Sequence, residues 1–267
     1  MMPLTAVLSS NGAGIIDPAL VWDIPAPRGY HRTSLPPDSF GAWLRRLPLK
    51  PPGSPVRLHD GRRKANQSAH HSVIDLPIGR RDLHQCADAV IRLRAEFLYD
   101  AGRTHEICFS ITSGPILSFA KWAEGLRPIV EHSRIRWVRR AGRDLSRRSL
   151  ESFLETAYCW CGTISLARDL VPAETGRLMA ISYVLVQGGS PGHAVIAVDE
   201  ADGPDGVVVL LAQSFMPAQE LHILINPNEP SLSPWYRIPE QGPLVTPEWI
   251  FREVKPMRFP DGRRCGK

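Results

Sequence analysis

The sequence lacks any apolar run that could span a bilayer, which takes about 20 consecutive apolar residues. It also lacks a convincing signal peptide, because its opening, MMPLTAVLSSNGAGIIDP, has no basic segment ahead of a short apolar run. The sequence as written therefore predicts a cytoplasmic protein without a transmembrane segment. Export is the alternative if translation starts further upstream.

Cysteine is scarce, and its spacing excludes two classes of small domain. The number is odd, and no CxxC pair repeats, so neither a disulfide framework nor a zinc ribbon is favoured. We expect no metal site and no cofactor. The cysteines are Cys86, Cys108, Cys159, Cys161 and Cys265.

The formal net charge is +5, and the excess of positive charge is local. Seven arginines fall within residues 134–148. No aromatic stacking platform or nucleic-acid-binding motif accompanies them, so we interpret the segment as a solvated surface and do not expect a nucleic-acid partner. The sequence sets no oligomeric state.

Apolar periodicity along the 267 residues predicts an α+β fold in which an antiparallel sheet packs against helices. We expect a flexible arm over 1–19, one domain over 20–260 and a tail over 261–267. The predicted helices cover 39–47, 82–102, 116–124 and 149–170. The predicted strands cover 71–76, 105–112, 178–187, 193–199, 207–213, 220–225 and 248–252.

The string GGSPGHAVIAVDE contains a histidine, His193, at the start of a predicted strand. The following EADGPDG is rich in turn residues, and pairing Asp199 with Val207 across it places His193 opposite Gln213. The Gln213 amide would then hold one ring nitrogen and leave the other free as a base. The alternative is that His193 is a polar residue that caps the strand.

Cys86 is the candidate nucleophile for such a base. It lies in the first turn of the helix predicted over 82–102, where the helix dipole would lower the pKa of its thiol. The alternative is a core cysteine, because Cys86 shares an apolar stripe with Val90, Leu93 and Phe97. Ser190 is a weaker candidate, since no GxSxG motif surrounds it.

Three further residues are candidates for substrate binding. The side-chain amide of Gln67 could donate a hydrogen bond to an oxyanion. Trp122 and Trp235 could line a cleft for a sugar or a peptide. The alternatives are a polar turn residue and packed aromatic rings.

Several strings together resemble a bacterial family called domain of unknown function 4846. They are IDLPIGRRDLHQCADAVIRLRAEFLY, FSITSG, FAKWAEG, QGGSPGHAVIAVDE, LLAQSFMPAQELHIL, SPWY and VTPEWIF. The resemblance runs from about residue 20 to residue 259. The family name implies no activity.

A second resemblance is to the NlpC/P60 and CHAP branch of papain-like hydrolases. It rests on the order of QCADAVIRL, ISYVLV, GHAVIAVD and LLAQS along the chain. It implies a thiol hydrolase or amidase acting on a cell-envelope peptide or glycopeptide, with Cys86 as nucleophile, His193 as base and Gln213 as the residue that orients it. The competing hypothesis is a non-catalytic module that binds an envelope glycan or a protein.

Overall fold

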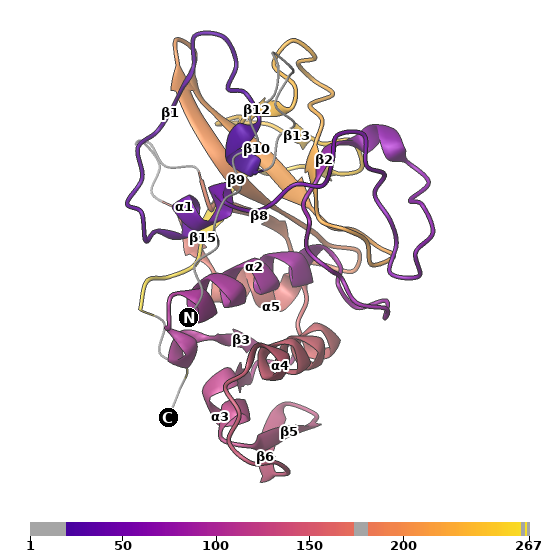
Figure 1. The fold of residues 1–267 in the computed structure, drawn as a ribbon, viewed down its shortest axis with the longest axis vertical. Helices are drawn as coiled ribbons and strands as arrows, with labels where there is room; N and C mark the ends of the chain where they lie inside the picture. The colour runs from indigo at the N-terminus through magenta and orange to yellow at the C-terminus, as the bar shows by residue number, and fades with distance from the viewer. Residues whose placement is uncertain (1–19, 174–180, 263–264, 266–267) are drawn as a thin grey trace, which may run out of the picture.

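The computed structural model describes residues 20–173, 181–262 and 265, and it has the α+β architecture that the sequence predicts (Figure 1). A nine-stranded antiparallel sheet fills the upper part of the view, and most of the helices lie below it. The strand order is β2-β11-β10-β9-β8-β15-β7, with β1 pairing with β9 and β12 pairing with β10. Its strands are β1 (His31–Arg32), β2 (His70–Val73), β7 (Val171–Pro172), β8 (Val184–Gln187), β9 (His193–Gly203), β10 (Gly206–Gln213), β11 (His222–Leu224), β12 (Trp235–Arg237) and β15 (Pro256–Arg258).

Three short hairpins and five α-helices complete the described fold. The hairpins are β3 (Cys108–Ser110) with β4 (Ile116–Ser118), β5 (Leu126–Glu131) with β6 (Arg134–Arg139), and β13 (Leu244–Val245) with β14 (Ile250–Phe251). The helices are α1 (Phe40–Arg45), α2 (Cys86–Asp100), α3 (Phe119–Ala123), α4 (Arg147–Trp160) and α5 (Thr163–Asp169). Short 3-10 helices cover Val21–Asp23, Gln67–Ala69 and Thr104–Glu106. None of the helices in the described ranges is both long and apolar enough to cross a membrane.

Alternation along β9 separates two hydrophobic clusters. Ala194 and Ile196 belong to the larger cluster, which also contains the buried face of α2 around Val90. Val195 and Ala197 belong to a smaller cluster. Because successive strand residues point to opposite faces, α2 covers one face of the sheet and the smaller cluster covers the other.

The pairing of β9 with β10 differs from the predicted register. Strand β9 runs on to Gly203, and Asp199 faces Leu210 rather than Val207. The register shifts by one residue between Leu210 and Leu211, which is the signature of a β-bulge. Because the bulge adds one residue to β9, Gln213 still points to the same face of the sheet as His193. The two side chains are diagonal neighbours, whereas the predicted register made them direct neighbours.

Helix α2 begins at Cys86, four residues later than the predicted start at Asp82. The Asp82 carboxylate instead accepts hydrogen bonds from the Ala218 backbone N–H and the Gln85 side chain, so it ties together two loops. Asp88 caps the helix, accepting the Gln85 backbone N–H at 3.0 Å. Cys86 is therefore the first residue of the helix.

The helix predicted over 149–170 is two helices, and the segment predicted as a helix over 116–124 begins with a short strand. Helix α4 ends at Trp160 and α5 begins at Thr163, with Gly162 in extended backbone conformation between them. Residues 116–118 form strand β4 before the short helix α3. Part of the predicted strand over 178–187, and the predicted arm over 1–19, lie outside the described residues.

The structure contains a disulfide between Cys108 and Cys265, a single bond that the sequence analysis, which disfavoured a disulfide framework, did not predict. The two residues are 157 positions apart, so no local spacing in the sequence reveals the pair. The bond joins β3 to the C-terminal segment that follows β15.

Removal of this disulfide is expected to destabilise the protein by about 3 kcal/mol, because the bond restricts a long loop in the unfolded chain. Chemical denaturation of the double variant Cys108→Ala/Cys265→Ala measures the effect. The variant Cys159→Ala, which removes an exposed free thiol, is the matched control. Equal stability of the double variant and the wild type would show that the bond does not form in solution.

Candidate functional site

A cavity of about 260 Å³ lies at the start of α2. Its walls come from three segments that are distant in the sequence: residues 82–88, the junction between α4 and α5, and the turn 189–192 within GGSPGH. Cys86 is part of the lining and is 6% exposed. Two of the segments that the sequence singles out, around Cys86 and before His193, therefore meet at one hollow.

The environment of the Cys86 sulfur has two opposing electrostatic influences. Burial raises the pKa of the thiol, and the nearby backbone N–H groups of Ala194 and Ala87 lower it. Burial prevails, so the pKa lies above its usual value, and the predicted lowering by the helix dipole is wrong in sign. Cys86 rests as a protonated thiol at neutral pH.

The predicted contact between His193 and Gln213 is present. The imidazole Nε2 lies 2.8 Å from the Gln213 Oε1, so Nε2 carries the proton and donates it. The other nitrogen, Nδ1, is buried and has no hydrogen-bond partner within the described residues. Burial lowers the pKa of His193 to about 4, against an opposing contribution from Gln213, and the ring is neutral at pH 7.

Two residues that the sequence analysis missed complete a buried polar network behind His193. The Gln213 Nε2 donates to Glu248 Oε2 at 2.9 Å, and the Lys64 ammonium pairs with the same carboxylate. Lys64 Nζ also lies 3.4 Å from the Nε2 of buried His222. Burial lowers the pKa of Lys64, which the Glu248 carboxylate opposes. The network fixes the orientation of the Gln213 amide and, through it, the tautomer of His193.

Cys86 and His193 lie on opposite faces of the sheet, and His193 does not line the cavity that contains Cys86. The sulfur lies near the backbone N–H of Ala194, the residue that follows His193, on the α2 side of the sheet. The imidazole packs against Trp249 and Phe251, at ring-centre distances of 5.2 and 5.8 Å, on the side of the smaller cluster. Within the described parts of the chain, no hydrogen bond connects the thiol to Nδ1.

The three predicted substrate-binding residues do not line this cavity. Gln67 is committed to backbone hydrogen bonds with Val56 and Lys64, so it stabilises a loop. Trp122 and Trp235 are 6% and 1% exposed and belong to the main core. The apolar surface of an indole favours burial, which explains why the alternative of core packing holds for both.

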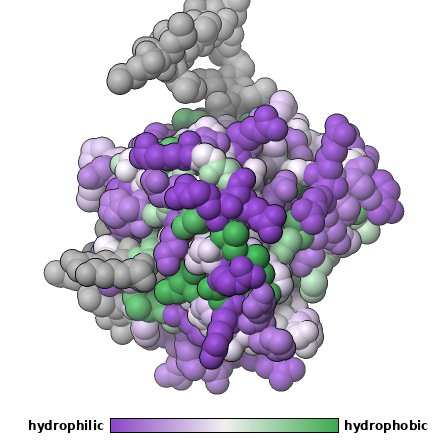
Figure 2. Space-filling model, turned by 90° about the horizontal axis from the view of Figure 1, so that it is seen from below, coloured by the Kyte–Doolittle hydropathy of each residue, from purple (hydrophilic) through white to green (hydrophobic). Residues whose placement is uncertain are grey.

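The arginine-rich segment covers β6 and the loop that leads to α4. Arg143 pairs with Glu124 at 3.0 Å, and Arg136 pairs with Glu131 at 3.4 Å, all four side chains being largely exposed. Seen from below, the molecule has many hydrophilic residues around a smaller apolar area (Figure 2). Exposed ion pairs of this kind are typical of a solvated surface.

No cluster of three or more metal-binding side chains occurs among the residues that the structure covers. The fold and the cavity thus define an α+β protein in which a buried cysteine begins a helix beside an antiparallel sheet. Residues 21–258 match the family model described as domain of unknown function (4846), and the chain belongs to this family. No curated protein matches the chain. No solved structure matches it either.

Proposed function

We propose that this protein is a thiol-dependent amide hydrolase that acts on a peptide or an envelope glycopeptide. Cys86 is the nucleophile, His193 the general base, and Gln213 the residue that orients the base. The observation that carries the proposal is the position of Cys86, at the first residue of α2 and inside a cavity, with the backbone N–H groups of Ala194 and Ala87 near its sulfur. Such a position stabilises the negative charge that develops on sulfur during attack.

The reaction follows from the protonation states of the two side chains. His193 Nδ1 accepts the thiol proton of Cys86 while the sulfur forms a bond to the carbonyl carbon of the substrate amide. The proton then passes to the departing amine as the carbon–nitrogen bond breaks, which leaves a thioester on Cys86. Water, deprotonated by the same nitrogen, hydrolyses the thioester and restores the thiol.

The proposal requires a rearrangement at the start of β9 when substrate binds, because the His193 ring packs on the side of the smaller cluster while Cys86 lies on the α2 side of the sheet. Catalytic hydrogen bonds are often long in free enzymes and tighten only in the complex. The non-catalytic alternative relied on a tryptophan-lined groove, and the burial of Trp122 and Trp235 removes that basis.

The alkylation rate of Cys86 as a function of pH tests the proposal. A simple thiol reacts as its thiolate, so its rate rises tenfold per pH unit below the pKa. A thiol that His193 deprotonates during attack reacts at a nearly constant rate from about pH 5 to pH 8, because the pKa of His193 is about 4. We expect the nearly constant rate in the wild type and a tenfold-per-unit rise in His193→Ala.

Peptide mass spectrometry after iodoacetamide treatment distinguishes Cys86 from the exposed Cys159, which serves as the internal control in every sample. The Cys159 rate should be the same in both proteins. If Cys86 is labelled only after unfolding, or with the same pH profile in both proteins, then it is a core cysteine and the proposed function is wrong.

A further inference from the structure

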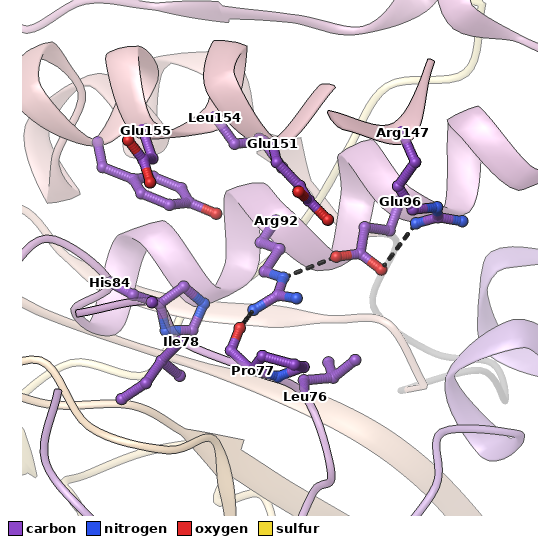
Figure 3. Close-up of a pocket in the computed structure, with 12 residues that line it drawn as sticks. Leu76, Pro77, Ile78, His84, Arg92, Glu96, Arg147, Glu151, Leu154 and Glu155 are labelled. Carbon is purple, nitrogen blue, oxygen red and sulfur yellow. Dashed lines mark hydrogen bonds and ion pairs between the residues drawn. The ribbon is translucent and has the colours of Figure 1, made fainter. Parts of the chain in front are cut away.

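A second cavity has a volume of about 390 Å³, and Figure 3 shows the side chains that line it. It is bounded by α2, α4 and residues 76–79. Tyr158 on α4 lines both cavities, so a ligand bound at Cys86 has the second cavity as its immediate neighbour. The volume falls in the range of small-ligand sites.

The two arginines that line the second cavity are already neutralised. Arg92 Nε lies 2.7 Å from Glu96, and another of its nitrogens donates to the Pro77 carbonyl. Arg147 pairs with Glu96 at 3.3 Å and with Asp100 as well. Figure 3 shows Arg92, Glu96 and Arg147 in one chain of contacts along the wall. These cations leave little positive charge for an incoming anion.

Two carboxylates of the lining are weakly paired. Glu151, Glu155 and Tyr158 are spaced four and three residues apart on α4, so they share one face of the helix. Glu155 has an exposed ion pair of 3.7 Å with Arg81, and Glu151 has no ion pair in the described part of the chain. Because Arg92 and Arg147 are already paired with carboxylates, Glu151 and Glu155 give the lining a net negative charge.

A buried imidazole adds an independent indication of a ligand. His84 is 2% exposed, lines the second cavity and packs edge-on against the Tyr158 ring at 5.6 Å. Neither ring nitrogen has a hydrogen-bond partner in the described residues; the backbone carbonyl of Gln219 lies nearby outside hydrogen-bond geometry. Burial lowers the pKa of His84 to about 3, so the ring is neutral. An unsatisfied buried nitrogen costs about 1–3 kcal/mol, and a bound donor group would offset that cost.

We infer that the second cavity is a subsite for a primary-amine side chain of lysine type, adjacent to the amide that Cys86 attacks. The ammonium group donates to Glu151 and Glu155, and to the neutral imidazole of His84 once that ring turns toward the cavity, since both ring nitrogens are covered in the free protein. Its alkyl stem lies along Leu154 and the Tyr158 ring, which also attracts a cation. This inference deepens the proposed function and rests on it for the role of the amine in a substrate.

Binding in the absence of turnover tests the subsite. Titration calorimetry on Cys86→Ala compares Nα-acetyl-lysine methylamide with its Nε-acetyl derivative and with the norleucine analogue. We expect the lysine probe to bind about tenfold more tightly than either neutral probe, which corresponds to about 1.4 kcal/mol. Adding Glu151→Gln and Glu155→Gln should abolish the preference, whereas Glu253→Gln, at an exposed carboxylate outside this cavity, should leave it unchanged.

The outcomes separate the subsite from the catalytic proposal. Equal affinity for the three probes, or a lysine preference that survives the two glutamine substitutions, would overturn the subsite whatever the activity of the wild type. A preference that depends on Glu151 and Glu155 supports the subsite. The preference could also be found while Cys86 is labelled only after unfolding, or with the same pH profile in the wild type and His193→Ala. In that case the subsite stands as a binding site and the hydrolase proposal fails.

Discussion

Cys86→Ala is expected to lower kcat/KM for amide hydrolysis about 10⁴-fold or more, because loss of a covalent nucleophile removes the whole acyl-enzyme pathway. His193→Ala should cause a loss of similar size, since residues that act as one unit are strongly non-additive. The assay measures the release of amine from N-acetylated dipeptide amides, with lysine-containing and neutral members in parallel.

A matched control is available within the same cavity. Cys161 is likewise not part of a disulfide and also lines the hollow at Cys86, but it is not the first residue of a helix. Cys161→Ala should therefore keep most of the activity. If Cys86→Ala and Cys161→Ala have equal kcat/KM, the assignment of the nucleophile is wrong.

Gln213→Leu should have a smaller effect, about 10- to 100-fold on kcat, because it leaves the base in place and removes only its orientation. Circular dichroism and thermal melting show whether the variant folds. A positioning role also predicts that Gln213→Glu, which keeps an acceptor for the Nε2 proton, recovers part of the loss. A variant series with unchanged kcat would show that the hydrogen bond to Gln213 is structural only.

The sequence predicted the contacts that depend on local pattern and on strand parity. The turn residues in EADGPDG predicted a hairpin with His193 and Gln213 on one face of the sheet. The bulge at Leu210 changes the register of the two strands, but both side chains remain on that face. The position of Cys86 at a helix start followed from polar residues that precede an apolar stripe, although the capping residue is Asp88 and not Asp82. Both results need only the periodicity of strands and helices.

What the sequence did not predict depends on segments that meet only in the folded chain. Lys64 and Glu248 come from loops 184 residues apart, and neither stands out by type or spacing. The disulfide partner of Cys108 follows the last strand. The raised pKa of Cys86 reflects how completely the fold covers the sulfur, which outweighs the helix dipole that the pattern suggested. Burial of that kind is a property of packing between distant segments.

Asp88 is the residue for which we expect the largest effect on stability. It lines the cavity at Cys86, one carboxyl oxygen accepts the Gln85 N–H, and the other is buried without a hydrogen-bond partner in the described residues. Burial raises the pKa of the carboxyl to about 8, and the backbone hydrogen bonds only partly oppose it. The carboxyl is therefore protonated in the folded protein at neutral pH and ionised in the unfolded chain.

The sign of the resulting pH dependence follows from linkage. A group whose pKa is raised by folding stabilises the protein fully below its unfolded pKa, near 4, and that contribution is lost as the pH rises toward 8. Over about 3 pH units at about 1.4 kcal/mol per unit, the loss at pH 7 is about 4 kcal/mol. Asp88→Asn, which stays neutral in both states, should thus be more stable than the wild type by about 3 kcal/mol at pH 7, after allowance for a weaker helix cap.

The same variant should gain nothing at pH 4, where the carboxyl is protonated in the folded protein. His84 and His193 act in the opposite direction, because folding lowers the pKa of each. Their contribution to stability is present above about pH 6.5 and is lost as the pH falls toward 4. Wild-type stability should therefore peak near pH 6.5, and Asp88→Asn should remove the decline above that pH and make the rise from pH 4 to pH 6.5 steeper.

Urea denaturation at half-unit pH steps from 4 to 8 measures both curves. If Asp88→Asn lowers stability at every pH, then Asp88 is an ionised helix cap and the cavity at Cys86 is more polar than its burial indicates. A gain that is absent at pH 4 and grows as the pH rises toward 8 would instead show a neutral carboxyl held beside Cys86 at a cost to the fold. Folds retain such destabilising groups at functional sites, so that result would add independent support for chemistry in this cavity.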